Sequence, residues 1–425
     1  GESQQDKRTR LGKSLAQEGL AASVLTLPES VCWLLNIRGE DIQNTPVVQC
    51  FAILHADGRV HLALHDPAQL SPELREHLGQ DVSLGRLSEF PDVLSQLSGR
   101  VTLDEASAPS AISRAMTKAD IVARRDPAVL PKAIKNAVEL QGARAAHLRD
   151  GAAMAEFLCW LDREAPAGNL TEIDVAQHLE SCRRSTNALK DISFETISGT
   201  GPHGAIVHYR VNTDTNLRVE PGHLLLVDSG GQYLDGTTDI TRTIAVGPAD
   251  EECRRVFTLV LRGMIAVSRL HWPAGLAGRD IDAAARMALW SEGLDYDHGT
   301  GHGVGAYLSV HEGPAAISRR SHEPLLPGMI LSNEPGYYRE GAFGIRIENL
   351  IAVKPAARPE GGDREMLSFE TLTLAPIDRN LIDASALTAD ERAWLNAYHA
   401  TVAAALTPLV AAETAIWLKS ATAPL

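Results

Sequence analysis

The chain has 425 residues, 44% of them hydrophobic, and a formal net charge of −14 at pH 7 with histidine neutral. This length predicts two or three globular domains, and the acidic balance argues against a nucleic-acid partner. No apolar run is long enough to span a membrane, and no signal peptide is visible. The five cysteines are scattered without a Cys-x-x-Cys pair, so a soluble, cytoplasmic protein with reduced thiols is expected.

Residues 1–131 predict an α/β domain. Helical spacing marks the first twenty residues, and helices are also expected at Ser71–Leu78 and Ser88–Leu97. Short apolar runs separate them, and these are Val24–Leu27, Val31–Leu35, Phe51–Leu54, Val60–Leu64 and Val101–Leu103. The segment His55–Gly58 has the composition of a hairpin turn. Two prolines between Asp126 and Pro131 break the pattern and predict a domain boundary.

Residues 132–425 alternate helical and strand-rich blocks. Long helical periodicity is followed by a helix whose start, Thr171 to Asp174, fits a capping box. Strands and Gly-rich turns follow, then two helices, a second strand-rich block and a C-terminal helical tail. The expected helices of this part are 132–163, 171–185, 251–270, 281–292 and 389–406.

The segment Leu224–Thr243 reads as two strands joined at Gly230 and Gly231. Such a hairpin brings Asp228 and Asp239 towards each other. Two facing carboxylates are unfavourable unless a proton or a cation lies between them. The pattern therefore predicts a cation site.

Histidines and glycines alternate in Asp295–Pro314, which contains a G-x-G-x-G-x-G pattern. A dinucleotide-binding fingerprint needs a strand before it and a helix after it, and no clear helix follows here. The glycines instead allow close backbone packing while the imidazoles point inward. The segment therefore favours a metal site over a phosphate-binding loop.

Two further acidic residues, Glu334 and Glu348, stand beside apolar strands. Either one alone is more typical of a buried salt bridge, for which Arg346 is a possible partner. Together with Asp228, Asp239 and His302, they make four carboxylates and one imidazole. Oxygen-rich ligation with one nitrogen suits a bridged pair of Mn²⁺, Co²⁺ or Zn²⁺ ions.

These five residues resemble the ligands of the metallopeptidase family with the pita-bread fold, which includes methionine aminopeptidase, prolidase, creatinase and aminopeptidase P. Local motifs narrow the resemblance to the long, cytosolic type of Xaa-Pro aminopeptidase (aminopeptidase P). The motifs are Trp33–Gly39, Gly201–Tyr209, His298–Gly305, Val310–Pro314 and Asn333–Tyr338.

The resemblance implies an α/β fold with two domains. Residues 1–131 resemble the creatinase N-terminal-like middle domain, and residues 132–425 resemble the pita-bread catalytic metallopeptidase domain. The long type normally begins with an additional domain, to which nothing here corresponds. Because Gly1 is also not an initiator methionine, a processed or truncated form of a three-domain enzyme is expected.

The resemblance also assigns roles to the ligands. Asp228 is a terminal ligand of one metal, Asp239 and Glu348 bridge both, and His302 and Glu334 hold the other. Two divalent ions, Mn²⁺ first among them, then activate a bridging water as hydroxide. Glu334 is also expected to accept the proton that this water loses.

Further side chains are expected to contact the substrate. By the resemblance, His208 and His311 bind substrate and steady the tetrahedral intermediate or pass protons, and His298 lines the proline pocket. Arg346 is expected at the substrate site, where it orients Asp228 or Glu348. Two tyrosines, Tyr337 and Tyr338, are either pocket walls or core residues.

The implied activity is release of the N-terminal residue from peptides with proline in second position. Prolidase, which cleaves Xaa-Pro dipeptides, is the alternative, and a non-catalytic peptide-binding module is a more distant one. The expected partners are such peptides, with no nucleic acid and no membrane. The C-terminal helix either forms a homodimer surface or packs inside the monomer.

Overall fold

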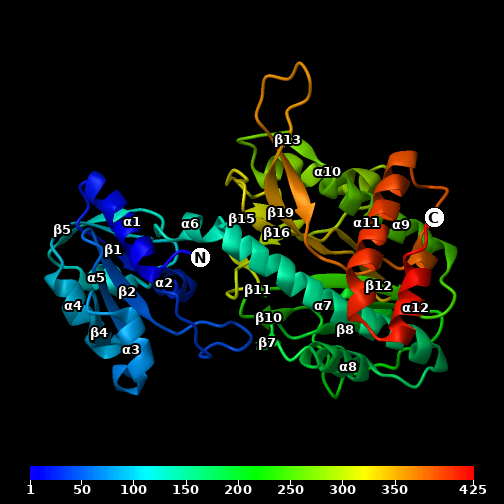
Figure 1. Cartoon of the computed structure of the whole chain (residues 1–425), viewed down its shortest axis with the longest axis horizontal. Coiled ribbons are helices and arrows are strands. Elements are labelled where there is room, and N and C mark those ends of the chain that lie inside the picture. Colours follow the sequence, from blue (N-terminus) through cyan, green and yellow to red (C-terminus); the bar gives the residue numbers. More distant parts are fainter. The chain divides into compact units, whose positions relative to one another are not determined.

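The computed structural model describes all residues, 1–425, and their contacts divide the chain into two compact units, Gly1–Lys132 and Ala133–Leu425 (Figure 1). Each unit has its own sheets and its own hydrophobic core. None of the helices is both long and apolar enough to cross a membrane.

The first unit is built on one mixed six-stranded sheet in the order β4-β3-β2-β1-β5-β6. Its strands are β1 (Ala22–Leu25), β2 (Phe51–His55), β3 (Val60–Leu64), β4 (Val82–Arg86), β5 (Gly99–Leu103) and β6 (Ala119–Ala123). Its helices are α1 (Gln4–Gln17), α2 (Pro28–Leu35), α3 (Pro72–Leu78), α4 (Phe90–Gln96) and α5 (Ser110–Ala115), and α6 (Val129–Ala133) leads out of it. The predicted α/β character of this part is confirmed.

The turn at His55–Gly58 joins β2 and β3 as an antiparallel hairpin, as its composition predicts. The apolar run Val31–Leu35, by contrast, belongs to helix α2, which begins with Pro28. A short run buried on every side has no period that separates strand from helix. The edge strands β4 and β6 carry partly exposed residues and therefore leave no apolar run in the sequence.

The second unit begins with the long helix α7 (Ala137–Glu164) and with α8 (Glu172–Arg184), which the predicted Thr171 capping box starts. A three-stranded antiparallel sheet, β12-β9-β8, and a six-stranded sheet, β13-β20-β19-β16-β14-β15, form its centre. The strands that position the site are β8 (Ile197–Thr200), β9 (Leu224–Ser229), β12 (Ile240–Ala245), β14 (Gly301–Gly303), β15 (Glu312–Ile317), β16 (Ile330–Asn333), β18 (Phe343–Arg346) and β19 (Asn349–Ala356).

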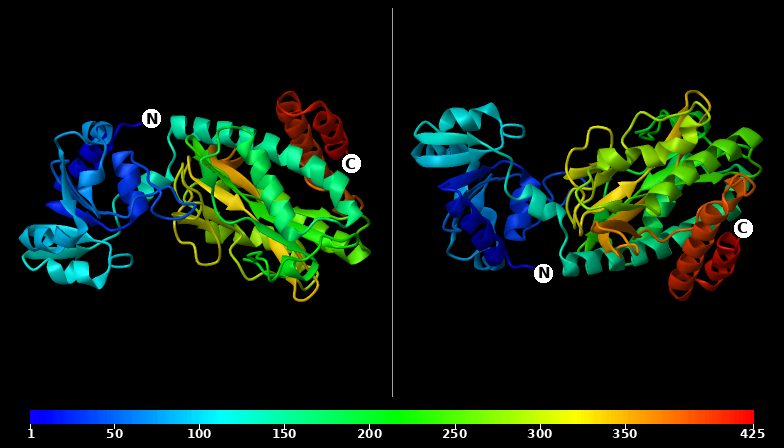
Figure 2. Two further views of the ribbon diagram at one scale, coloured as in Figure 1. Left: turned by 90° about the horizontal axis from the view of Figure 1, so that it is seen from below. Right: turned by 90° about the horizontal axis from the view of Figure 1, so that it is seen from above.

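The remaining helices of this unit are α9 (Glu251–Ser268), α10 (Gly278–Trp290), α11 (Ala389–Leu406) and α12 (Ala412–Ala421). The two C-terminal helices pack beside α7, and α11 also packs against α9 (Figure 2). The apolar side of α11, which includes Leu395 and Val402, is buried in this core.

The predicted hairpin of two aspartates exists with one addition. Strands β9 and β12 pair antiparallel, with Asp228 opposite Thr241, and the chain between them forms the small β10 (Gly231–Tyr233) and β11 (Gly236–Thr237) hairpin. The backbone bends at Gly230, where a Cβ atom would lie 2.0 Å from the carbonyl oxygen of Thr238. Only glycine allows this approach.

Glycine has the same function in the histidine-rich segment. A Cβ atom at Gly301 would lie 2.0 Å from the carbonyl oxygen of Ser332, because β14 runs directly beside β16. The expectation that glycines permit close backbone packing there is confirmed. The strand register then shifts between His302 and Gly303, which marks an irregularity at the histidine itself.

A buried histidine on α11 predicts a measurable pH dependence of stability. His399 accepts a hydrogen bond from the backbone N–H of Ile377 at 3.1 Å, and burial, with Arg242 nearby, lowers its pKa to about 4. Below pH 6.5 this histidine binds a proton in the unfolded chain but stays neutral in the folded chain, so the free energy of unfolding falls as the pH drops. Between pH 7 and pH 4, His399 alone lowers the free energy of unfolding by about 3 kcal/mol.

We expect His399→Gln, which keeps an acceptor but does not titrate, to flatten this decline in guanidinium unfolding measured from pH 7 to pH 4. His271→Gln is the control, because His271 is exposed on the same unit. Parallel pH profiles for wild type and His399→Gln would contradict the assignment.

Candidate metal centre

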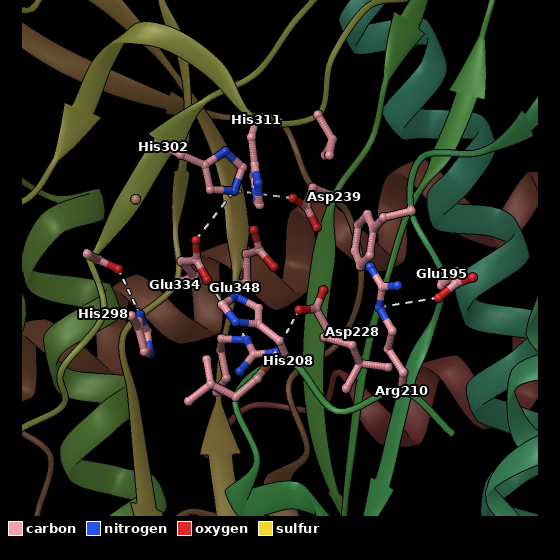
Figure 3. Close-up of a pocket in the computed structure, with 17 residues that line it drawn as sticks. Glu195, His208, Arg210, Asp228, Asp239, His298, His302, His311, Glu334 and Glu348 are labelled. Carbon is pink, nitrogen blue, oxygen red and sulfur yellow. Dashed lines mark hydrogen bonds and ion pairs between the residues drawn. The ribbon is translucent and has the colours of Figure 1, made fainter. Parts of the chain in front are cut away.

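Five acidic or imidazole side chains converge from five separate strand ends. Asp228 lies on β9, Asp239 just before β12 and His302 on β14. Glu334 follows β16, and Glu348 lies between β18 and β19. The five side chains point towards one another around one space (Figure 3).

The distances within this group are those of a site that could hold metal. Ligand atoms of Asp239, His302 and Glu348 all lie within 4.8 Å of one another. The Nε2 atom of His302 is 3.4 Å from a carboxylate oxygen of Asp239 and 3.4 Å from one of Glu334. Since Nδ1 of His302 donates to the carbonyl oxygen of Gly303 at 2.9 Å, Nε2 carries the lone pair that faces the carboxylates.

The buried, clustered carboxylates also favour a bound cation. Burial, together with neighbouring carboxylates, raises the pKa of Asp239 and of Glu348 well above the usual range, and burial raises that of Glu334. The oxygens Asp228 Oδ1 and Glu348 Oε1 are buried without a hydrogen-bond partner in the protein. Buried, unpaired carboxylate oxygens are costly unless a cation satisfies them. The donor set of four carboxylates and one imidazole therefore fits a pair of divalent metal ions.

Arg346 holds two of these carboxylates in place. Its Nη2 atom donates to Asp228 at 2.6 Å, and its Nε atom donates to the hydroxyl of Thr241 at 3.2 Å. That hydroxyl donates to Glu348 at 2.8 Å. Arg346 therefore orients Asp228 directly and Glu348 through Thr241.

A directed chain of hydrogen bonds leads from Arg346 to His298. Arg346 donates to the phenol oxygen of Tyr338 at 2.7 Å, and Tyr338 donates to Nε2 of His298 at 2.8 Å. Nδ1 of His298 donates to the carbonyl oxygen of Gly299 at 2.8 Å. Both nitrogens of His298 are thus used within the protein, and only its ring face is left for a ligand.

Two of the histidines in the cavity, His298 and His311, have lowered pKa values that favour the neutral imidazole at pH 7. Burial lowers the pKa of His298 to about 4, and the protein around His311 lowers its pKa to about 4 although the ring opens on the cavity. The His311 ring contacts that of His302 edge to face, with centroids 4.1 Å apart. A neutral imidazole both accepts and donates a proton, as acid–base chemistry requires.

The cavity around these groups has a volume of about 440 Å³. It contains all five predicted ligands, the three predicted histidines and Arg346. His298 lies at one end, the carboxylates lie in the middle, and Glu195 and Arg210 lie at the other end (Figure 3). Neither Tyr337 nor Tyr338 lines the cavity; Tyr338 lies behind it, between Arg346 and His298.

A buried carboxylate anchors the loop that carries His208. Glu172, at the start of α8, is fully buried and accepts hydrogen bonds from four residues of the segment 200–217. The donors are the backbone N–H groups of Thr200 and Leu217, the His203 ring and the Tyr209 hydroxyl. The bond from its ring to Glu172 makes His203 a structural residue of this loop.

The sequence did not reveal the residues that support the ligands. Thr241 and Thr243 share a strand face with Asp239, and Thr243 pairs with the backbone of Arg346. The alternation in Asp239–Thr243 is the signal that could have found them. Arg242, on the opposite face, is buried and donates to the carbonyl oxygen of Glu348 at 2.6 Å. Nothing local distinguishes it from a surface arginine.

Four carboxylates and an imidazole that converge in one cavity from antiparallel strands are typical of a metal-dependent hydrolase. The model of metallopeptidase family M24 matches residues 141–355, that of the creatinase/prolidase N-terminal domain matches residues 1–139, and that of the C-terminal region of peptidase M24 matches residues 365–425. The chain belongs to metallopeptidase family M24. The predicted combination of a creatinase-N-like α/β domain and a pita-bread domain is confirmed.

Within this family the chain is similar to Xaa-Pro aminopeptidases P. It is 41% identical to the probable Xaa-Pro aminopeptidase P of Laccaria bicolor over 439 residues, covering 100% of this chain and 68% of that protein. It is 42% identical to that of Aspergillus fumigatus, covering 95% of this chain and 64% of that protein. The chain thus spans about two thirds of the length of these relatives. The resemblance to Xaa-Pro aminopeptidases P that the motifs predict is confirmed.

Two solved structures are also similar to this chain. The cytosolic X-prolyl aminopeptidase of Caenorhabditis elegans, which has a dinuclear active site, superposes with a TM-score of 0.93 at 34% identity over 100% of this chain and 71% of that one. A Xaa-Pro dipeptidase from Bacillus anthracis superposes with a TM-score of 0.71 at 23% identity, over 88% of this chain and 99% of that one. The second likeness shows the shared fold alone.

Proposed function

We propose that this chain is a metal-dependent aminopeptidase that releases the first residue from peptides with proline in second position. The observation that carries the proposal is the convergence of Asp228, Asp239, His302, Glu334 and Glu348 in one cavity, with buried carboxylate oxygens left unsatisfied by the protein. The similarity to Xaa-Pro aminopeptidases P over nearly the whole chain supports the substrate class.

Asp228, Asp239, His302, Glu334 and Glu348 would hold two divalent ions, of which we propose Mn²⁺, with Co²⁺ and Zn²⁺ also compatible with these ligands. Metal ions held by these residues would supply Lewis-acid chemistry, which polarises a carbonyl group and lowers the pKa of water. Glu334 lies at the edge of the group, where its second oxygen is 3.9 Å from Nε of Arg346. We propose that Glu334 accepts the proton released by that water.

The histidines and Arg346 complete the site. His208 and His311 line the cavity beside the carboxylates, and we propose that they stabilise the charge that develops on the carbonyl oxygen and pass a proton to the leaving nitrogen. The face of His298 is proposed to receive the proline ring. The tertiary amide of proline has no N–H and its ring fixes φ, so a dedicated pocket is needed to bind it.

The choice between aminopeptidase P and prolidase is testable with two substrates. We expect initial rates on Arg-Pro-Pro to exceed those on Arg-Pro, because the relatives that match nearly the whole chain are Xaa-Pro aminopeptidases P. A chromatographic assay of released arginine measures both rates under identical metal loading. A strong preference for the dipeptide would favour the prolidase alternative, and tight binding of both peptides without cleavage would favour a non-catalytic module.

Location and assembly are also proposals. All five cysteines are free and four of them are buried, which is compatible with a cytoplasmic protein. The predicted homodimer does not follow from helix α11, because its apolar side is buried in the core of its own chain. This burial supports the alternative in which the C-terminal helix packs inside the monomer, and a homodimer formed through another surface stays a prediction.

A further inference from the structure

One ion pair of the cavity lies outside the group of candidate metal ligands. Arg210 and Glu195 line the end of the cavity opposite His298, and the Nε atom of Arg210 is 3.3 Å from a carboxylate oxygen of Glu195. The exposed fractions of the two side chains are 77% and 46%. An ion pair this exposed stabilises a fold by little, so both charges are available to a ligand in the cavity at small cost to the fold.

The two arginines of the cavity differ in how they are held. Arg346 is 2% exposed and is held by Asp228, Thr241 and Tyr338. Arg210 contacts Glu195 through a single nitrogen, and no other hydrogen bond holds its guanidinium. Arg346 is therefore fixed, whereas Arg210 keeps most of its donors free and can turn towards a ligand.

The placement of Arg210 is nonetheless constrained. Its backbone follows His208 and the buried Tyr209, whose hydroxyl donates to Glu172 at 2.9 Å. The backbone of Arg210 is therefore held in place by its buried neighbour Tyr209, two residues after His208. In Figure 3 the guanidinium lies between the carboxylates of Asp228 and Glu195, so the charge that this end of the cavity turns towards the centre is positive.

The two ends of the cavity meet different parts of the substrate, a step that rests on the proposed function. If the proline ring lies against His298 and the scissile bond lies at the central carboxylates, the first residue of the peptide extends towards Glu195 and Arg210. Phe194, which precedes Glu195 in the sequence, also lines the cavity. The ring of Phe194 offers the apolar contact for the stem of this side chain. Arg210 offers donors to its end.

We propose that Arg210 is a specificity-determining residue that selects an acidic side chain, Asp or Glu, at the first position of the substrate, and that Glu195 holds the guanidinium ready. An incoming carboxylate replaces Glu195 as the partner of Arg210 and gains paired N–H donors. A lysine or arginine at that position meets a like charge. The discrimination is electrostatic and weakens with salt.

The test is a ratio of kcat/KM values for Glu-Pro-Pro and Gln-Pro-Pro, which differ in charge but hardly in shape. For the wild type we expect Glu to be favoured by roughly 3- to 5-fold at low salt, the upper range of exposed ion pairs. In Arg210→Gln the ratio should fall to about one or below. In Arg210→Glu the preference should turn towards Lys-Pro-Pro.

A matched control is available in the same loop. Arg218 is exposed and does not line the cavity, so Arg218→Gln should keep the wild-type ratio. Because each ratio is taken within one variant, a general loss of activity or folding cancels.

The outcomes separate this inference from the proposed function. A Glu/Gln ratio near one in the wild type, or an unchanged ratio in Arg210→Gln, would overturn the role of Arg210 while cleavage of Gln-Pro-Pro upholds the activity. Failure to cleave any of the three peptides with both metals loaded would remove the proposed function and this inference with it.

Discussion

Asp239→Asn should abolish turnover by removing the metal ions, with a loss in kcat/KM of at least about 10³-fold. Asp239 is 3% exposed and faces both His302 and the other carboxylates, so its amide variant fits the same space. An amide nitrogen cannot coordinate a cation, and the remaining oxygen carries no formal charge. Elemental analysis should find less than the wild-type metal content per chain, and chelation of the wild type should reproduce the loss of activity.

A second readout separates this effect from misfolding. In metal-free protein, the thermal unfolding midpoint of Asp239→Asn should lie above that of the wild type, because one of several clustered, buried carboxylates has become neutral. A variant damaged in its fold would shift the other way. Asp214→Asn, at an exposed position of the loop before β9, should change neither quantity. Full metal content and full activity in Asp239→Asn would refute the proposed centre.

His208→Ala and His311→Ala should each lower kcat by roughly 10²–10³-fold while the metal content stays at the wild-type value. Both residues line the cavity, but the group of mutually close ligand atoms consists of Asp239, His302 and Glu348. Removing either histidine therefore removes a donor to the developing charge and leaves the ligands in place.

Turnover and metal content must be measured on the same preparation, with His271→Ala as the control because His271 is exposed and lies outside the cavity. Metal loss in either variant would make that histidine a ligand. A change in KM alone would reduce its role to substrate binding.

Much of the fold could be predicted locally. The helices α7 and α8 follow from helical periodicity and from the capping box at Thr171, and the β2–β3 hairpin follows from its turn. The run Val31–Leu35 shows the limit, since complete burial erases the period that distinguishes helix from strand. The edge strands β4 and β6 were missed for the opposite reason, because partial exposure leaves them without an apolar run.

The sequence by itself determined the chemistry of the centre: four carboxylates and a histidine stand where buried strands end, and such residues are costly there without a cation. Only the tertiary structure decided which groups hold them. Arg346 donates hydrogen bonds to Thr241 and Asp228, which lie more than a hundred residues earlier in the sequence. Glu172, on helix α8, accepts hydrogen bonds from the loop that carries His208.

The physical reason is that sequence patterns record contacts between neighbours two to four residues apart, whereas buried arginines and carboxylates find partners only when distant segments dock. An arginine that orients a metal ligand, such as Arg346, and one that is exposed at the end of the cavity, such as Arg210, therefore look alike in the sequence.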